Sequence, residues 1–63
     1  MHNHVRKLRK EQRLTQAELA KKAQVSRATI SGLENGLINT SKISTLKRIS
    51  EALGSEIGDI FLP

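Results

Sequence analysis

Apolar residues recur three or four positions apart along most of this chain, which is the spacing of one face of an α-helix. No run alternates apolar and polar positions for long, as a half-buried strand would. The only proline is the last residue, Pro63, and no linker rich in glycine or proline divides the chain. The pattern predicts an all-α protein with five helices in a single domain over residues 1–63, of which residues 1–4 form a frayed tail.

The first two helices are marked by apolar spacing and by one capping signal. A basic segment with apolar residues three apart predicts a helix over about residues 4–13. Thr15 and Glu18 form the capping-box pattern, in which each side chain accepts a hydrogen bond from the other residue's backbone N–H. A second helix is therefore expected from residue 16 to about residue 23. Its buried residues would be Leu19, Ala20 and Ala23.

Three further helices follow from caps, stops and apolar stripes. Ser26 would cap a third helix that ends near Asn35 and Gly36, a natural left-handed stop. A polar loop over residues 37–41 leads to a fourth helix closed by Gly54, and residues 56–61 predict a short last turn. The expected core residues are Ile30 and Leu33 in the third helix, Ile43, Leu46, Ile49 and Leu53 in the fourth, and Ile57, Ile60 and Phe61 in the last.

The connection between the second and third helices is very short. Only Gln24 and Val25 stand before the cap Ser26. Two short helices joined so tightly cannot lie antiparallel and must cross steeply, as in a helix-turn-helix. A small residue at the crossing point and apolar residues at the turn fit this geometry. These positions are Ala20, Val25, Ile30 and Leu33.

Several segments resemble the Cro/phage-repressor (XRE-type) helix-turn-helix family, and the resemblance extends over about residues 5–62. It implies a compact five-helix, lambda-repressor-like domain with the helix-turn-helix over about residues 16–35. The matching segments are Leu14–Ala20, Val25–Arg27, Ile30–Ser31, Leu33–Gly36, Leu46, Ile49–Gly54 and Asp59–Phe61.

The resemblance also implies sequence-specific DNA binding, with the third helix in the major groove. Arg27 is the one residue there that can donate two hydrogen bonds to guanine. The glutamine that opens the second helix, here Gln16, would contact a phosphate and brace the recognition helix. The implied base contacts are Arg27, Ala28, Ser31 and Gly32. The implied phosphate contacts are Gln16, Ser26, Thr29, Asn35, Thr40 and Lys42.

One feature of the chain matches a further part of the family pattern, and two positions depart from that pattern. The resemblance implies a partly buried ion pair between Arg9 and Glu34. Many such motifs have glycine where Gln24 stands, at a positive φ that costs a non-glycine residue about 1 kcal/mol. Ser41 replaces a proline that is common before the fourth helix, which leaves this loop less constrained.

Charge narrows the class of partner. The chain has a formal net charge of +5. Residues 1–27 hold eight basic and two acidic residues, whereas residues 28–63 hold three basic and four acidic residues. This asymmetry favours a polyanion, nucleic acid before an acidic membrane surface. Charge alone is equally compatible with a solvated helix face.

Composition excludes several classes of protein. Sixty-three residues without cysteine provide one small core, no disulfide and no thiolate metal site. The longest apolar run, residues 60–62, is too short for a signal peptide or a membrane helix, so a cytoplasmic protein is expected. The DNA binding that the resemblance implies would make it nucleoid-associated. His2 and His4 lack a third ligand nearby, so no metal is expected.

Catalysis finds no support in the sequence. There is one aspartate, no glycine-rich phosphate loop and no serine beside a base. A small helical domain also has little room for a substrate pocket. We therefore expect neither an enzyme nor a cofactor.

The expected function is that of a repressor that binds a palindromic operator as a homodimer, because one recognition helix reads only a few base pairs. The dimer surface would be the exposed side of the fourth helix with Ile57, Phe61 and Leu62. Two alternatives remain open: an antitoxin or controller component that also binds a protein partner, and a protein-docking module that has kept the fold.

Overall fold

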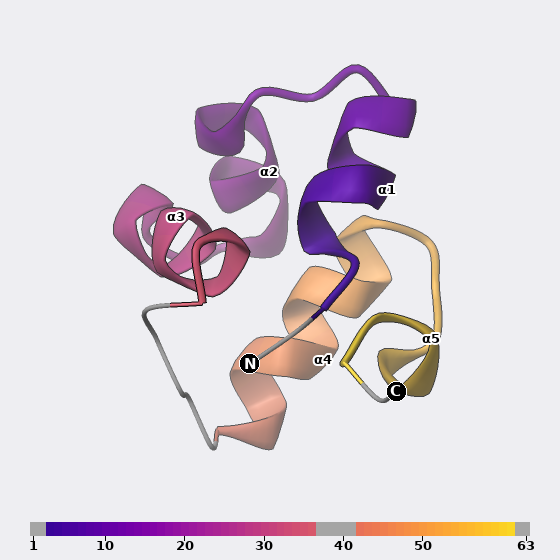
Figure 1. Ribbon diagram of the computed structural model, residues 1–63. Helices are drawn as coiled ribbons and strands as arrows, with labels where there is room; N and C mark the ends of the chain where they lie inside the picture. Colours follow the sequence, from indigo (N-terminus) through magenta and orange to yellow (C-terminus); the bar gives the residue numbers. More distant parts are fainter. Residues whose placement is uncertain (1–2, 37–41, 62–63) are drawn as a thin grey trace.

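The computed structural model describes residues 3–36 and 42–61, and within them it contains five helices and no strand. In Figure 1, α4 runs beneath α1 and α2, with α3 on one flank and α5 on the other. The all-α, five-helix prediction is confirmed. The helices are α1 (Val5–Glu11), α2 (Gln16–Ala23), α3 (Arg27–Glu34), α4 (Ile43–Ala52) and α5 (Ile57–Phe61).

The caps of α2 and α3 form as the sequence predicts. The Glu18 backbone N–H donates to Thr15 Oγ1 at 3.0 Å, and the Thr15 N–H donates to Glu18 Oε1 at 2.8 Å. At the start of α3, Ser26 Oγ accepts from the Thr29 N–H at 3.1 Å. These bonds satisfy backbone donors that a helix start leaves without a partner.

The turn between α2 and α3 has the left-handed geometry that the family pattern implies. Gln24 has φ +59°, and the next N–H, that of Val25, donates to Ala20 O at 3.0 Å. This six-residue closure is the Schellman motif, which normally uses glycine at the left-handed residue. Gln24 therefore stands where glycine would be free of strain.

The first helix ends two residues before the predicted Arg13. Arg13 itself is left-handed, with φ +58°, and the Leu14 N–H donates to Arg9 O at 3.1 Å, which closes a second Schellman motif. Because this residue is not glycine, asparagine or aspartate, nothing local in the sequence marks the stop. The Gln12 side chain also donates to Leu53 O, at the end of α4, at 2.7 Å.

The start of the chain differs from the expected frayed tail. Asn3 Oδ1 accepts from the Val5 N–H at 3.0 Å, and Asn3 Nδ2 donates to Leu33 O at 3.0 Å. The His4 N–H donates to Ile60 O, also at 3.0 Å. Residues 3 and 4 are thus fastened to α3 and α5, while residues 1 and 2 lie outside the described residues.

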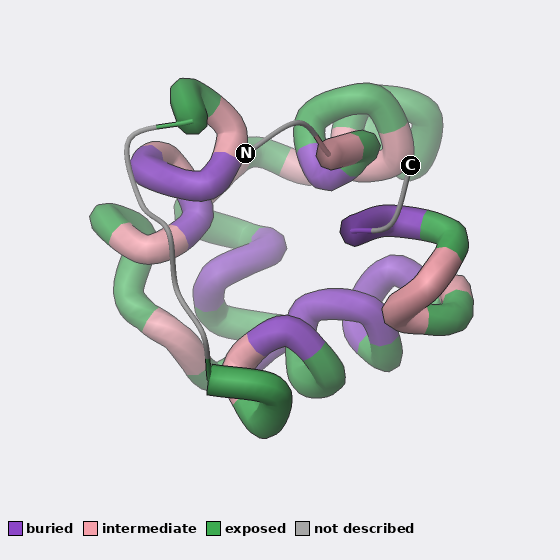
Figure 2. The backbone as a smooth tube through the Cα atoms, turned by 60° about the horizontal axis from the view of Figure 1, so that its bottom comes forward, coloured by how far each residue is buried: buried purple, intermediate pink, exposed green. Residues whose placement is uncertain are grey.

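Every helix contributes buried residues to the core (Figure 2). Complete burial of one valine, leucine or isoleucine side chain stabilises a fold by about 1.5–3 kcal/mol. The stripe predicted on α4 is correct except at its first residue: Ile43 is 65% exposed, because it opens the helix and borders a groove with Ile57. The buried apolar residues are Val5, Leu19, Ala20, Ala23, Ile30, Leu33, Leu46, Ile49, Ala52, Leu53, Ile60 and Phe61.

Candidate nucleic-acid interface

One side of α3 is open to solvent and the other belongs to the core. Arg27 and Ala28 are exposed and Ser31 is half-buried, whereas Ile30 and Leu33 are buried. The exposed end of the helix is its first turn, directly after the Ser26 cap. An α-helix presented in this way has the size and shape that fit the major groove of B-DNA.

Gly32 differs from the other expected base contacts, because it is buried. A glycine has no side chain to project, and neighbouring atoms cover its backbone here. Its place among the residues exposed to DNA is therefore wrong for this structure. The open positions on the described part of α3 are those of its first turn and the half-buried Ser31.

The hydroxyl groups at the start of α3 are already engaged with each other. Ser26 Oγ and Thr29 Oγ1 lie 2.8 Å apart, in addition to the cap bond from the Thr29 N–H. Ser26 is exposed and Thr29 is half-buried. Both keep oxygen atoms on the surface, so the capping geometry leaves them open to a further polar partner.

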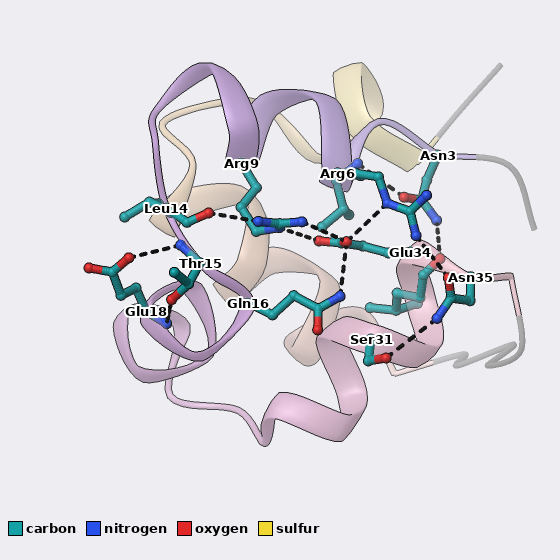
Figure 3. Close-up of polar contacts among 12 residues, drawn as sticks. Asn3, Arg6, Arg9, Leu14, Thr15, Gln16, Glu18, Ser31, Glu34 and Asn35 are labelled. Carbon is teal, nitrogen blue, oxygen red and sulfur yellow. Dashed lines mark hydrogen bonds and ion pairs between the residues drawn. The ribbon is translucent and has the colours of Figure 1, made fainter.

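Glu34, the last residue of α3, lies at the centre of a polar network (Figure 3). Its side chain has no exposed surface. Arg9 donates from Nε to Oε2 at 2.6 Å and from Nη2 to Oε1 at 3.1 Å. Arg9 Nη1 also donates to Leu14 O at 2.7 Å, so this guanidinium joins α1 to the α1–α2 connection and to α3. The ion pair that the family resemblance implies is present in the structure.

This network shifts the pKa values of both partners of the ion pair. Burial by itself would raise the pKa of Glu34, but hydrogen bonds from Arg9, Gln16 and Arg6 outweigh burial and hold that pKa below its ordinary value. The hydrogen bond to Glu34 raises the pKa of Arg9. Both groups are therefore charged at neutral pH.

Gln16 also joins the network. Its Nε2 donates to Glu34 Oε1 at 3.1 Å, which links the first residue of α2 to the last residue of α3. The brace that the family resemblance implies for this glutamine is thus visible. Gln16 is half-buried and lies at the start of α2, where a helix leaves its first backbone N–H groups without an intrahelical partner.

Sequence reasoning missed Arg6 as a member of this network. Its Nε donates to Glu34 Oε1 at 3.2 Å and its Nη2 donates to Asn35 Oδ1 at 2.8 Å. Asn35 Nδ2 in turn makes a long hydrogen bond of 3.4 Å to Ser31 Oγ. The sequence held a signal for this role, because Arg6 precedes Arg9 by three residues and therefore lies on the same face of α1.

Of the remaining expected DNA contacts and dimer residues, some are exposed, some are buried, and some lie outside the described residues. Lys42 is exposed and forms the N-cap of α4, and Thr40 lies outside the described residues. Phe61 is buried in the core, so it is not a surface residue of a dimer, and Leu62 lies outside the described residues. Ile57 is half-buried and borders the groove between α4 and α5.

A metal-binding cluster and a membrane-spanning helix are both absent from the described residues. Within residues 3–36 and 42–61, no group of three or more histidine, cysteine, aspartate or glutamate residues could hold a metal ion. No helix in the described part of the chain is long and apolar enough to cross a membrane.

Comparison with known proteins agrees with the geometry of α2 and α3. A family model described as helix-turn-helix matches residues 5–60. This chain belongs to that family, in its XRE-type branch. The family comprises DNA-binding transcription regulators, and nothing in the comparisons indicates catalysis.

Individual relatives have regulatory names. An uncharacterized HTH-type transcriptional regulator of Methanothermobacter thermautotrophicus is 49% identical over 92% of this chain and 84% of its own length. The immunity repressor protein of Bacillus phage phi105 is 39% identical over 89% of this chain and 38% of its own length. A Mycobacterium tuberculosis protein named "Putative antitoxin HigA2" is 38% identical over 84% of this chain. The chain spans only 52% of the length of that last relative.

A solved structure has the same fold. The SinR protein/SinI protein complex contains a chain that matches with a TM-score of 0.81 and 29% identity, over 87% of this chain and 53% of that chain. The arrangement of helices in Figure 1 is thus similar to that of a helix-turn-helix domain in a solved structure.

Proposed function

We propose that this chain is a transcriptional repressor that binds operator DNA with α3 in the major groove. The observation that carries the proposal is the state of α3. Its first turn, with Arg27 and Ala28, is open, while its last residue, Glu34, is fixed by Arg9 and Gln16. A recognition helix must be exposed where it reads bases and rigid where it is supported. Such a regulator would act on the nucleoid in the cytoplasm.

The contacts divide into those that read sequence and those that hold the backbone. Arg27 can donate two hydrogen bonds to O6 and N7 of guanine, and Ala28 can contact a thymine methyl group. Ser31, one turn later, offers a hydroxyl group to a neighbouring base. The residues assigned to phosphates are Gln16, Ser26, Thr29, Asn35, Thr40 and Lys42, and contacts of this kind position the protein without carrying sequence information.

We assign the second subunit of a homodimer to the groove between α4 and α5. Ile43 and Ile57 border this groove together with Lys47, Glu51 and Glu56. An interface with two-fold symmetry brings the same patch of each subunit together, so apolar centres meet and residues of opposite charge can pair across the axis. This groove takes the place of the buried Phe61 in the predicted dimer surface. The operator would then be palindromic.

Selection of bound sequences from random duplex DNA tests the proposal. A symmetric consensus with half-sites about one helical turn apart, and two protein chains per duplex, is the expected result. Recovery of unrelated sequences, with affinity that does not depend on base sequence, would overturn sequence-specific repression. An asymmetric site bound by a single chain would overturn the dimer while leaving specific binding intact.

A second function adds a protein partner to DNA binding. It is favoured by the similarity to a protein named as an antitoxin and to a chain of the SinR protein/SinI protein complex. The exposed Ile43 provides an apolar contact point for such a partner. If purified chain alone remains monomeric at concentrations that saturate DNA, the groove between α4 and α5 belongs to another protein rather than to a second copy.

A further inference from the structure

The polar network around Glu34 contains more positive than negative charge. Two guanidinium groups, those of Arg6 and Arg9, share one carboxylate. The Arg9 side chain is only 11% exposed, whereas that of Arg6 is 49% exposed. The shorter contacts to Glu34 belong to Arg9. The unbalanced positive charge of the network therefore resides on Arg6, at the surface.

The Arg6 guanidinium is held in place yet has donors to spare. Its Nε bonds Glu34 and its Nη2 bonds Asn35, so the plane of the group is fixed by two neighbouring residues of the α3 end. Within the described residues no hydrogen bond uses Nη1. An arginine fixed in this way loses little side-chain entropy when it binds an anion, and its fork matches phosphate oxygens.

Arg6 is also linked to two residues already assigned to the DNA backbone, Gln16 and Asn35. It shares Oε1 of Glu34 with Gln16 and bonds Asn35 directly (Figure 3). A phosphate that approaches these residues comes close to the buried Glu34 carboxylate, which repels it. Arg9 balances that carboxylate, so the charge of Arg6 remains available to the phosphate.

We propose that Arg6, on α1, binds a backbone phosphate of the DNA that α3 reads, with Asn35 as the residue that orients its guanidinium. This inference rests on the proposed function. It assigns the contact to a helix outside the helix-turn-helix. With a phosphate bound, the two guanidinium groups would face two anions, the Glu34 carboxylate and the phosphate. Neither anion alone balances the charge of both arginines.

The test measures binding to a short random-sequence duplex as a function of salt concentration. Neutralising one phosphate contributes about 0.9 to the slope of log affinity against log salt. Arg6→Ala should lower the magnitude of that slope by about 0.9, so its affinity deficit relative to the parent shrinks about 3.5-fold between roughly 50 and 200 mM salt. Arg6→Lys, which keeps the charge, should retain most of the parent slope.

Lys7→Ala is the matched control, because Lys7 is an exposed cation on the same helix that borders α5 instead of α3. Its slope should stay within about 0.3 of the parent value, since a distant charge releases few counterions. Equal slopes for Arg6→Ala and Lys7→Ala would overturn the proposal and leave Arg6 a structural residue. If Arg6→Ala does not fold, Arg6→Gln and Arg6→Lys give the same comparison. Failure of the parent to bind any duplex would instead contradict the proposed function.

Discussion

Arg9 and Glu34 are joined by two roughly parallel hydrogen bonds, of 2.6 Å and 3.1 Å, across 25 positions of sequence. They fix the end of α3 to α1, and Gln16 attaches the start of α2 to the same carboxylate. The three helices that present the candidate DNA surface therefore meet at one buried anion. Removing that anion should loosen the packing of α1, α2 and α3 against one another rather than a single contact.

Breaking the pair on one side should cost more than replacing both partners. Glu34→Ala leaves the Arg9 guanidinium, only 11% exposed, without its carboxylate and should lower the free energy of unfolding by about 1–3 kcal/mol. The double variant Arg9→Met with Glu34→Leu should recover much of this loss, because apolar side chains of similar size tolerate burial. Chemical denaturation measures both, with Lys10→Met as an exposed control on α1. Single and double variants that unfold like the parent would show that the pair adds nothing.

Acid should weaken the fold through the same carboxylate. The folded-state pKa of Glu34 lies below its ordinary value of 4.5, so the stabilisation is present above about pH 4.5 and disappears as pH falls through the folded-state pKa. In Glu34→Gln, the free energy of unfolding should therefore fall less steeply between about pH 5 and pH 3 than in the parent. Denaturant unfolding at a series of pH values measures this, with Glu51→Gln as a control for loss of one exposed carboxylate. An unchanged pH dependence in Glu34→Gln would contradict the pKa shift.

The left-handed residue between α2 and α3 offers a stabilising substitution. Gln24 has φ +59° and is exposed, so Gln24→Gly removes backbone strain without removing packing. It should raise the free energy of unfolding by up to about 1 kcal/mol, since the strain exceeds the entropy that glycine adds to the unfolded chain. Lys22→Gly, two residues earlier inside α2, should do the reverse by about 1 kcal/mol. Thermal unfolding of the two variants would contradict this account if both shifted in the same direction.

Local signals in the sequence predict most of the helices, because caps and stops involve neighbouring residues. Thr15 and Glu18 stand three residues apart, and the same spacing makes their reciprocal bonds in the structure. The left-handed geometry of Gln24, in contrast, was implied by the family resemblance and not by its residue type. Arg13 is equally left-handed, but neither its residue type nor the resemblance indicated this, so the predicted first helix ran two residues too far.

Contacts between distant segments account for the remaining differences. Spacing put Ile43 on the same stripe as Leu46, but no spacing rule states that other elements leave the first turn of α4 uncovered. The bonds from Asn3 to Leu33 and from Arg6 to Asn35 join residues about thirty positions apart. Family resemblance supplied the Arg9–Glu34 pair, yet the convergence of further donors on that carboxylate depends on the relative placement of three helices.

Substitutions of Arg27 and Gln16 should change DNA binding in different ways. Arg27 is exposed in the first turn of α3, so Arg27→Ala should remove about 1–3 kcal/mol of discrimination at one base pair in each half-site, most simply a guanine. Gln16 opens α2, beside backbone N–H groups that favour a phosphate, so Gln16→Ala should weaken all sequences alike and leave the preferred base unchanged. Because Gln16 also donates to Glu34, its variant should lose some stability, whereas Arg27→Ala should not.

The measurement is the affinity of both variants for the selected operator and for a set of its single-base variants, at one salt concentration and at a temperature where both proteins are folded. Ala17→Ser, at an exposed position next to Gln16, controls for a change at the start of α2 that leaves the Gln16 side chain intact. If Arg27→Ala lowers every affinity by the same factor, Arg27 is a phosphate contact. Base readout must then come from Ala28, Ser31 and the region of Lys42, because the buried Gly32 presents no side chain to the groove.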